Sequence, residues 1–493
     1  MLVTIRAEMT LWDSILPESA RGLPRGLAEV DGLLDDGRFF EPFVAFFSAR
    51  SGRPSIPMET YIRMMVLKYR YGLGFETLCA EVADSLAWRR FCRIPLGEAV
   101  PHPSTLQKIT TRVGEVAIAG LNEKLLEKAA EAKLVRCDRM RSDTTVLPAN
   151  VAYPSDAGLL AKGVRRVTRL VARLQTAGLA RRTRFRDRTR SMARRAHGIG
   201  AWLRRRSDEA KDEVMAITAE MVTIAAAAAL DAAAVAANSR RALRRQGNRA
   251  AGSAKATLAA LERDIAALEA VIAQTKVRVA GKIPDGSKRV VSFHDPDARP
   301  IAKGRLGKPV EFGYKVEVTD NTDGVIVDHQ VHQGNPPDAP MLAPAIARIK
   351  ARFGRSPSQV TADRGYGQAD VEADLEALGV KYVAIPRKGR PNAERRQVER
   401  STRFVKLVKW RTGSEGRIAA LKRNWGWDRT LMDTTNGAAI WCAWGVLAHN
   451  SFKIATLAQS GGTHSATTTR PRPPRPPGSG APTGPPDMTA TAA

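Results

Sequence analysis

The first quarter of the chain has apolar residues at helical spacing. In 58–72 (METYIRMMVLKYRYG) they recur at intervals of three and four residues, and 75–85 repeats the pattern over a shorter length. Residues 1–135 are therefore expected to form an all-helical N-terminal domain.

The stretch 101–114 (PHPSTLQKITTRVG) carries signals for both the start and the interruption of a helix. Ser104 and Gln107 have the spacing of a capping box, and Gly114 indicates a break. Two short helices followed by this polar one are typical of a helix-turn-helix unit, but equally of an ordinary bundle with solvated faces. In the first interpretation four residues would face DNA: Thr105, Lys108, Thr111 and Arg112.

The pattern changes after residue 135. Residues 140–154 (MRSDTTVLPANVAYP) are rich in β-branched side chains and end in proline, which predicts a strand. Residues 157–283 are again helical and heavily basic, and the amphipathic stretch 256–275 indicates antiparallel helices or a coiled-coil hairpin. The arginine-rich part, 181–198, is either a surface that follows phosphates or part of a merely soluble helical insertion.

Strands and helices alternate from residue 288 onward. Residues 289–293 are a short candidate strand, and 313–320 and 324–331 alternate with period two around an Asp-Gly turn, which predicts a hairpin. The elements expected next are a helix over 341–354, a strand over 358–367, a helix over 368–379, a strand over 381–386 and a helix over 411–423.

These patterns divide the chain into five segments. Residues 136–156 and 284–455 are expected to form one α/β core, which the helical segment 157–283 interrupts. The Pro/Thr-rich tail, 456–493, has too little apolar surface to fold and is expected to be disordered.

The charge indicates a polyanionic partner. Lys and Arg number 78 against 50 Asp and Glu, for a net charge of +28, and each phosphate that is neutralised releases counterions. A membrane is the second candidate, but the Ala-rich stretch 221–238 is interrupted by Asp231 and no basic-then-apolar leader opens the chain. The four cysteines form no CxxC pair, which favours reduced thiols in a cytoplasmic protein.

Three acidic residues could share a metal ion. If the strands that carry Asp143 and Asp363 are parallel neighbours, their backbones lie about 5 Å apart, and the two carboxylates repel unless a cation lies between them. A helix packed on the sheet would bring Glu415 to the same place. Oxygen ligands suit Mg²⁺, and two such ions about 4 Å apart activate an attacking oxygen and stabilise a leaving one.

Cations surround this constellation. On one continuous helix, Arg411, Glu415 and Lys422 fall within an arc of about 40°, which would present a metal ligand beside two phosphate contacts. The alternative is an ordinary Arg–Glu pair with a surface lysine. Arg364, beside Asp363, is a further phosphate contact.

Other residues were weighed for the same roles. Glu399 could replace Glu415, although it lacks the spacing to a downstream lysine, and Asp138 and Asp156 fit capping or surface positions. Asp295 and Asp297 fit a turn or a substrate contact. The remaining candidates are Trp425 and Trp427, for base stacking or for packing, and His329 and His332, which strand spacing points to opposite faces.

Three stretches carry a resemblance to a known family: 142–160, 361–367 and 411–429. They resemble bacterial insertion-sequence transposases of the DDE type, and 294–304 and 441–450 are similar to the same group. The signature Arg-x3-Glu-x6-Lys is met by Arg411, Glu415 and Lys422, and Asp143 and Asp363 match the first two acidic positions. Many members have a tyrosine three residues before the arginine, where this chain has Val408.

The resemblance implies an RNase H-like mixed five-stranded sheet. It also implies a Mg²⁺-dependent enzyme (or Mn²⁺, with two ions per site) that uses Asp143, Asp363 and Glu415 to cut DNA at the element's ends. The freed 3′-OH would then attack target DNA. The N-terminal domain would bind the terminal inverted repeats, and the protein would act in the bacterial cytoplasm, at the nucleoid, as a dimer or larger synaptic complex without a membrane.

The expected DNA contacts are Arg411, Lys422, Arg364, Lys108 and Arg112. Two alternatives remain open: an RNase H-like endonuclease without strand transfer, and an inactive transposase remnant that only binds DNA.

Overall fold

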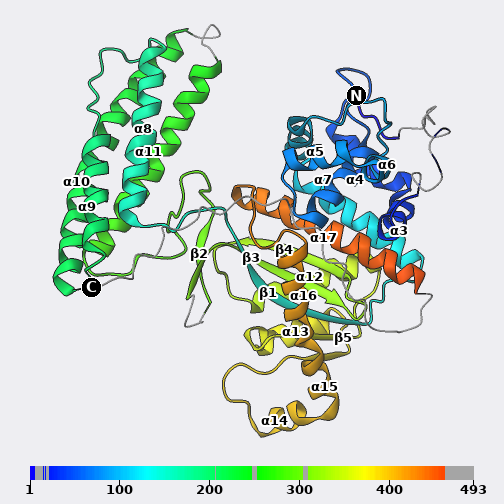
Figure 1. The fold of residues 1–493 in the computed structure, drawn as a ribbon. Coiled ribbons are helices and arrows are strands. Elements are labelled where there is room, and N and C mark those ends of the chain that lie inside the picture. Colours follow the sequence, from blue (N-terminus) through cyan, green and yellow to red (C-terminus); the bar gives the residue numbers. More distant parts are fainter. Residues whose placement is uncertain are drawn as a thin grey trace, which may run out of the picture.

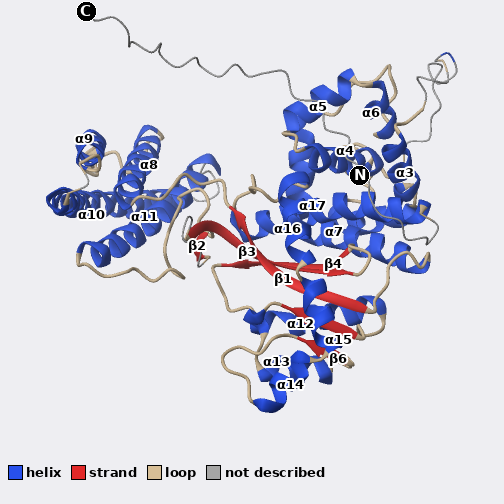
Figure 2. Cartoon of the chain, turned by 60° about the horizontal axis from the view of Figure 1, so that its bottom comes forward, coloured by secondary structure: helices blue, strands red, loops and turns tan. Residues whose placement is uncertain are grey.

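A mixed sheet lies at the centre of the molecule, with a helical part on each side. The computed structural model describes residues 1–5, 15, 17, 22–205, 207–246, 252–303 and 309–460. In Figures 1 and 2 the N-terminal helices lie on one side of the sheet, and the bundle formed by α8 to α11 lies on the other. The expected disordered tail largely lies outside the described residues, although its first residues continue the last helix.

The sheet has six strands in the described residues, one more than expected. They are β1 (Arg139–Pro148), β2 (Arg299–Ala302), β3 (Val310–Asn321), β4 (Ile326–Gln333), β5 (Gln359–Ala362) and β6 (Tyr382–Ala384). The order is β2-β3-β1-β5-β6, with β4 also paired to β3. β3 is antiparallel to β1, β2 and β4, whereas β1, β5 and β6 are parallel. The predicted mixed sheet and its hairpin are confirmed, and β2 is the strand that the sequence did not predict.

The predicted strand over 289–293 is wrong. Val291 is buried in the main core, whereas Phe293 is buried in the core of the helical bundle. The apolar side chains of this segment therefore pack at the junction of two cores and do not form a ladder.

The helical character of the N-terminal region is confirmed over its described residues. Its elements are α3 (Arg25–Leu34), η1 (Gly37–Phe46), α4 (Met58–Tyr71), α5 (Phe75–Asp84), α6 (Leu86–Phe91) and α7 (Pro103–Glu131). α7 contains the predicted interruption at Gly114, where φ is 61°. The predicted capping box is wrong, because His102 caps the helix by accepting a hydrogen bond from the backbone N–H of Ser104, and Pro103 occupies the first position.

The last helix, α17 (Thr434–Gln459), joins the N-terminal helices to the sheet. It packs on α3, α4, α7 and β4, and its central residues are buried on every side. Trp444 lies edge-on to Tyr61 with ring centroids 5.6 Å apart, and the amide of Asn450 exchanges two hydrogen bonds with the backbone of Ile326. The N-terminal helices and the sheet consequently share one hydrophobic core.

The insertion between β1 and β2 is a bundle of helices with its own core. The helices are α8 (Asp156–Thr176), α9 (Thr189–Trp202), α10 (Asp208–Gln246) and α11 (Gly252–Val279). Apolar faces of α8, α10 and α11 form a core separate from the main one. Among the described residues α10 alone is long and apolar enough to cross a membrane by length and composition, a test that core helices of soluble bundles also pass.

Opposite faces of the sheet are covered by different helices. The remaining helices are α12 (Ala339–Phe353), α13 (Ala369–Ala377), α14 (Ala393–Arg400), α15 (Thr402–Arg411) and α16 (Gly413–Asn424). Asp143 of β1 contacts α16, whereas its neighbour Thr144 contacts Asp338 at the start of α12, since successive strand residues point to opposite faces. The single helix predicted over 411–423 is divided at Thr412, so Arg411 ends α15.

Candidate active site

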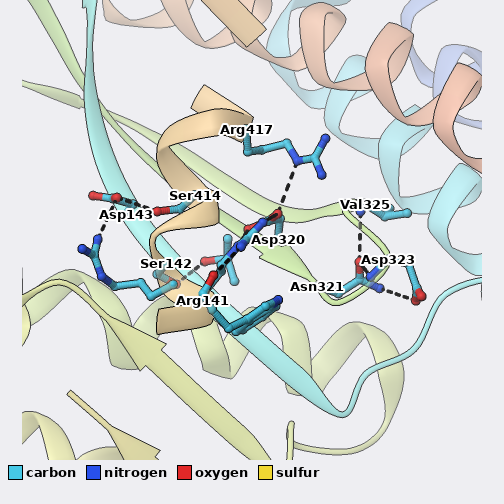
Figure 3. Close-up of polar contacts among 12 residues, drawn as sticks. Arg141, Ser142, Asp143, Asp320, Asn321, Asp323, Val325, Ser414 and Arg417 are labelled. Atoms are coloured by element: carbon cyan, nitrogen blue, oxygen red, sulfur yellow. Dashed lines mark hydrogen bonds and ion pairs between the residues drawn. The ribbon is translucent and has the colours of Figure 1, made fainter. Parts of the chain in front are cut away.

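Asp143 is a largely buried carboxylate in the middle of β1. Its Oδ2 accepts a 2.7 Å hydrogen bond from the Ser414 hydroxyl and lies 3.3 Å from Nη1 of Arg411 (Figure 3). Burial raises the pKa of Asp143, the Ser414 hydroxyl and the Arg411 guanidinium oppose that rise, and the charge of Asp363 adds to it. A cation close to Asp143 would therefore stabilise the charged form of this carboxylate.

Asp363 stands beside Asp143 at the end of the neighbouring strand. The last parallel pair of β1 and β5 is Ser142 with Ala362, so both aspartates follow one position later. Neighbouring strands are about 5 Å apart, which places the two residues side by side. Asp363 is exposed and caps the short helix η3 (Arg364–Tyr366) by accepting from the backbone N–H of Arg364. The structure therefore brings these two predicted residues together.

Glu415 lies in the first turn of α16 and is exposed. The residue of this turn that reaches Asp143 is Ser414, which is 3% exposed. Within the described ranges, no three His, Cys, Asp or Glu side chains are close enough together to hold a metal ion. The paired aspartates supply the hard oxygen ligands that Mg²⁺ prefers, but Glu415 is not gathered with them, and its role stays a prediction.

Three of the five cations predicted to contact DNA have protein partners near Asp143 and Asp363. Arg411 pairs with Asp143, and Nζ of Lys422 donates to the carbonyl of Val146 at 2.7 Å, which ties α16 to β1. Arg364 donates to the carbonyls of Arg387 and Gly389. Their predicted contacts with DNA stay predictions.

A buried ion cluster fixes α16 over the sheet (Figure 3). The Arg141 guanidinium makes two 2.8 Å hydrogen bonds to Asp320 of β3 and one of 2.7 Å to the carbonyl of Trp410. Arg417 of α16 approaches the same carboxylate at 3.3 Å. Breaking a buried pair of this kind costs about 3–5 kcal/mol, so the cluster holds the helix firmly against β1 and β3.

Sequence reasoning missed Ser414, Arg141, Asp320 and Arg417. Arg141 lies two residues before Asp143, so it shares that face of β1. That period-two relation was the one signal available, whereas the pairing with Asp320 depends on the register of β1 and β3.

A second buried carboxylate lies on the opposite face of the sheet. Glu317 of β3 is 1% exposed, and one of its oxygens accepts a 3.3 Å hydrogen bond from the Tyr366 hydroxyl while the other has no partner. Burial raises the pKa of Glu317 to about 7, and the charge of Asp328 adds to this effect.

The other acidic candidates have structural partners. Glu399 accepts from the backbone N–H of Arg387 and from Arg395, which argues against it as the third catalytic carboxylate. Asp156 pairs with Arg278 at the base of the bundle, and Asp138 is an exposed residue near Arg355.

Residues 294–298, directly before β2, form a turn that supports the last helix. Asp295 accepts from the backbone N–H of Thr434, and Asp297 accepts from the backbone N–H and hydroxyl of Thr435. The two aspartates therefore provide hydrogen-bond acceptors for backbone N–H groups at the start of α17, which have no partner within the helix.

The aromatic and histidine candidates pack in the interior. Trp427 is fully buried and Trp425 is 6% exposed, so neither is available to stack on a base. Burial lowers the pKa of His329 to about 4 and lowers that of His332.

The polar face of α7 is open to solvent. Lys108, Thr111 and Arg112 are exposed, and Thr105 is half-buried. The Arg112 guanidinium lies 5.2 Å from the ring centroid of Phe47. This exposure is compatible with both a DNA-reading helix and a solvated bundle.

Comparisons with known proteins agree with this geometry. Residues 18–112 match a family model described as a transposase domain, and residues 277–451 match one described as a transposase DDE domain. The protein of ORF8 in the nfe locus of Rhizobium meliloti, which is uncharacterized, is 26% identical over 150 residues, covering 29% of this chain and 72% of that protein. No solved structure matches the chain.

The sheet order, with Asp143 and Asp363 following adjacent parallel strands, is that of an RNase H-like core. Together the two family models span more than half of the chain, with the helical model before this core and the DDE model within it. The chain belongs to the DDE-type insertion-sequence transposases.

Proposed function

We propose that this transposase cuts DNA at the ends of an insertion sequence and joins the freed 3′-OH to target DNA, in a reaction that depends on Mg²⁺ or Mn²⁺. The observation that supports this most directly is the register of β1 and β5, which sets Asp143 and Asp363 side by side. The net charge of +28 suits a DNA substrate.

In this proposal each acidic residue has a defined task. Asp143 and Asp363 would hold the divalent ions between them, and Glu415 would complete the site from α16. The bound ions would activate the attacking oxygen and stabilise the leaving one. Ser414 and Arg411 orient the Asp143 carboxylate, and the Arg141–Asp320–Arg417 cluster keeps α16 in place.

The exposed position of Glu415 in the first turn of α16 is compatible with assembly of the site on DNA. Glu415 follows Ser414 directly, and the break at Thr412 separates this turn from α15. The proposed partners are terminal inverted repeats and target DNA, bound by a dimer or larger synaptic complex in the bacterial cytoplasm.

Cleavage of a duplex that contains the inverted repeats flanking the gene tests the assignment. We expect Asp143→Asn, Asp363→Asn and Glu415→Gln each to lower the cleavage rate by about 10³-fold or more. When catalytic residues act as a unit, the loss of one removes most of the rate enhancement that they provide together. Glu399→Gln is the matched control and should cleave within a few-fold of wild type. Full cleavage by Asp143→Asn, or loss only in Glu399→Gln, would overturn the assignment.

The same assay separates the two alternatives. Joined products identify a transposase, whereas cleavage without joining identifies a nuclease. A protein that binds the duplex but never cuts it, with either metal ion present, would be an inactive remnant.

A further inference from the structure

The helical insertion carries most of the protein's excess positive charge. Residues 157–283 contain 27 Lys and Arg against 10 Asp and Glu, a net charge of +17, whereas the other 366 residues contribute +11. The bundle has its own core, so its surface charge is not needed for packing against the sheet. A surface of one charge sign lowers folding stability because its charges repel one another, and a bound partner of opposite charge would relieve this repulsion.

The arginines of the bundle fall into two groups. Where an arginine joins two helices, the chain supplies a carboxylate, as for Arg188 with Asp231 and Arg195 with Glu220. A second group is exposed and makes no ion pair among the described residues. Six members of this group lie on the segment between α8 and α9 and near the end of α10, and they are called the arginine surface: Arg181, Arg182, Arg184, Arg186, Arg241 and Arg245.

The segment that joins α8 to α9 is held in one conformation. The Thr183 carbonyl accepts from Gln175, and the Thr183 hydroxyl accepts from Asn238 of α10 at 2.7 Å. Phe185 packs against the bundle core. Because alternate residues face inward, Arg184 and Arg186 point to solvent about 7 Å apart. A charged surface that is already ordered loses little entropy on binding.

The chemistry of the surface favours phosphate. From 181 to 206 the chain has arginines and no lysine, and the planar guanidinium can bind phosphate through two parallel hydrogen bonds. Arg241 of α10 contacts Asn238, which in turn holds Thr183, so the two parts of the surface adjoin. Most large apolar residues of α10 face the bundle core, and the exposed Leu230 alone does not make the continuous apolar face of a membrane-binding helix.

We propose that the arginine surface binds the phosphate backbone of duplex DNA without regard to sequence, as a second DNA-binding surface beside the catalytic core. The inference rests on the proposed function in so far as the substrate is DNA. The bundle leaves the sheet directly after β1, the strand that carries Asp143, and Figure 1 shows it standing beside the sheet. α10, with 39 residues, is about 58 Å long, which corresponds to about 17 base pairs.

Binding of the full chain to a duplex of about 40 base pairs without inverted repeats tests the proposal. Fluorescence anisotropy is measured with EDTA at several salt concentrations, for wild type and for the fourfold variant Arg181→Gln, Arg182→Gln, Arg184→Gln and Arg186→Gln. We expect the variant's Kd to rise at least about tenfold, and the slope of log K against log salt to become shallower by about 3. The matching fourfold Lys variant should recover most of the slope.

A control variant removes the same charge from another face. Lys255→Gln, Arg263→Gln, Lys276→Gln and Lys282→Gln change exposed residues on or just beyond α11, and this variant should bind within about threefold of wild type. Equal losses in both variants, or no loss in the arginine variant, would overturn the proposal. Binding to anionic phospholipid vesicles in place of DNA would also overturn it.

The result is separable from the proposed function. The duplex lacks element ends and EDTA prevents metal-dependent cleavage, so binding is measured without chemistry. If the wild-type protein failed to cleave element ends, the proposed function would fall, but this binding result would stand.

Discussion

Burial sets the protonation of two carboxylates on opposite faces of the sheet. Asp143 and Glu317 both have a raised pKa, but their neighbours differ. Asp143 receives hydrogen bonds from Ser414 and Arg411, which support its charged form. Glu317 receives one long bond from Tyr366 and has one oxygen without a partner, so its neutral form is favoured up to about pH 7.

Glu317→Gln should change how stability depends on pH. The folded-state pKa of about 7 lies above the unfolded value near 4.5, so the folded protein binds this proton more tightly, and stability falls as pH rises from about 4.5 to 7. The neutral variant lacks this loss, and we expect it to be more stable than wild type by up to about 3 kcal/mol at pH 8. Near pH 4.5 the two proteins should be similar.

Denaturant unfolding at both pH values checks this. The groups that face Glu317 are Asp328, Asp338, Arg348 and Tyr366, and none of them is altered. An equal stability difference at pH 4.5 and pH 8 would contradict the prediction.

The helical insertion behaves as an element with its own packing. Leu268 of α11 is fully buried in the bundle core, whereas Leu121 of α7 is fully buried in the main core. Gly163 lets Leu268 of α11 and the Phe293 ring pack closely against α8. A Cβ at this position would lie 2.8 Å from a methyl of Leu268 and 2.6 Å from the Phe293 ring.

Leu268→Ala should loosen the insertion alone. The cavity should cost about 2–5 kcal/mol, and amide hydrogen exchange should accelerate in α8, α10 and α11 but not in β1 or α4. The control Leu121→Ala should accelerate exchange in α4 and the sheet while sparing the bundle. Faster exchange throughout the chain in Leu268→Ala would show that the two cores unfold together.

At the scale of the whole molecule, α17 holds the N-terminal helices and the sheet together. This helix is far from the N-terminal helices in sequence, yet it packs between them and β4. Asn122 of α7 donates to the Ala443 carbonyl, and Asn450 pairs with the backbone of Ile326. The N-terminal helices, which are expected to bind DNA, and the sheet that carries Asp143 are therefore packed as one unit.

Trp444→Ala should destabilise both regions in one step. The buried indole contacts Tyr61 and Tyr69, and its removal should cost about 3–5 kcal/mol. The indole N–H of Trp444 has no hydrogen-bond partner, so Trp444→Phe should cost less, about 1–2 kcal/mol. Thermal unfolding should show one transition for the N-terminal helices and the sheet, and two separated transitions would contradict the shared core.

The sequence by itself determined most of the local elements and placed Asp143 and Asp363 on or directly after strands. Gly114 marked a kink because it adopts positive φ, and alternation revealed the hairpin of β3 and β4. Asp143 and Asp363 could be predicted because each lies on or directly after a recognisable strand.

Tertiary structure decided what these patterns left open. The helix break at Thr412, the choice of Ser414 as the partner of Asp143 and the burial of Arg141 with Asp320 all depend on strand register and helix docking. The division into two cores followed from which apolar faces met, as Val291 and Phe293 show. Local periodicity specifies which face of an element is apolar, but the partner that covers this face is selected by contacts between residues distant in sequence.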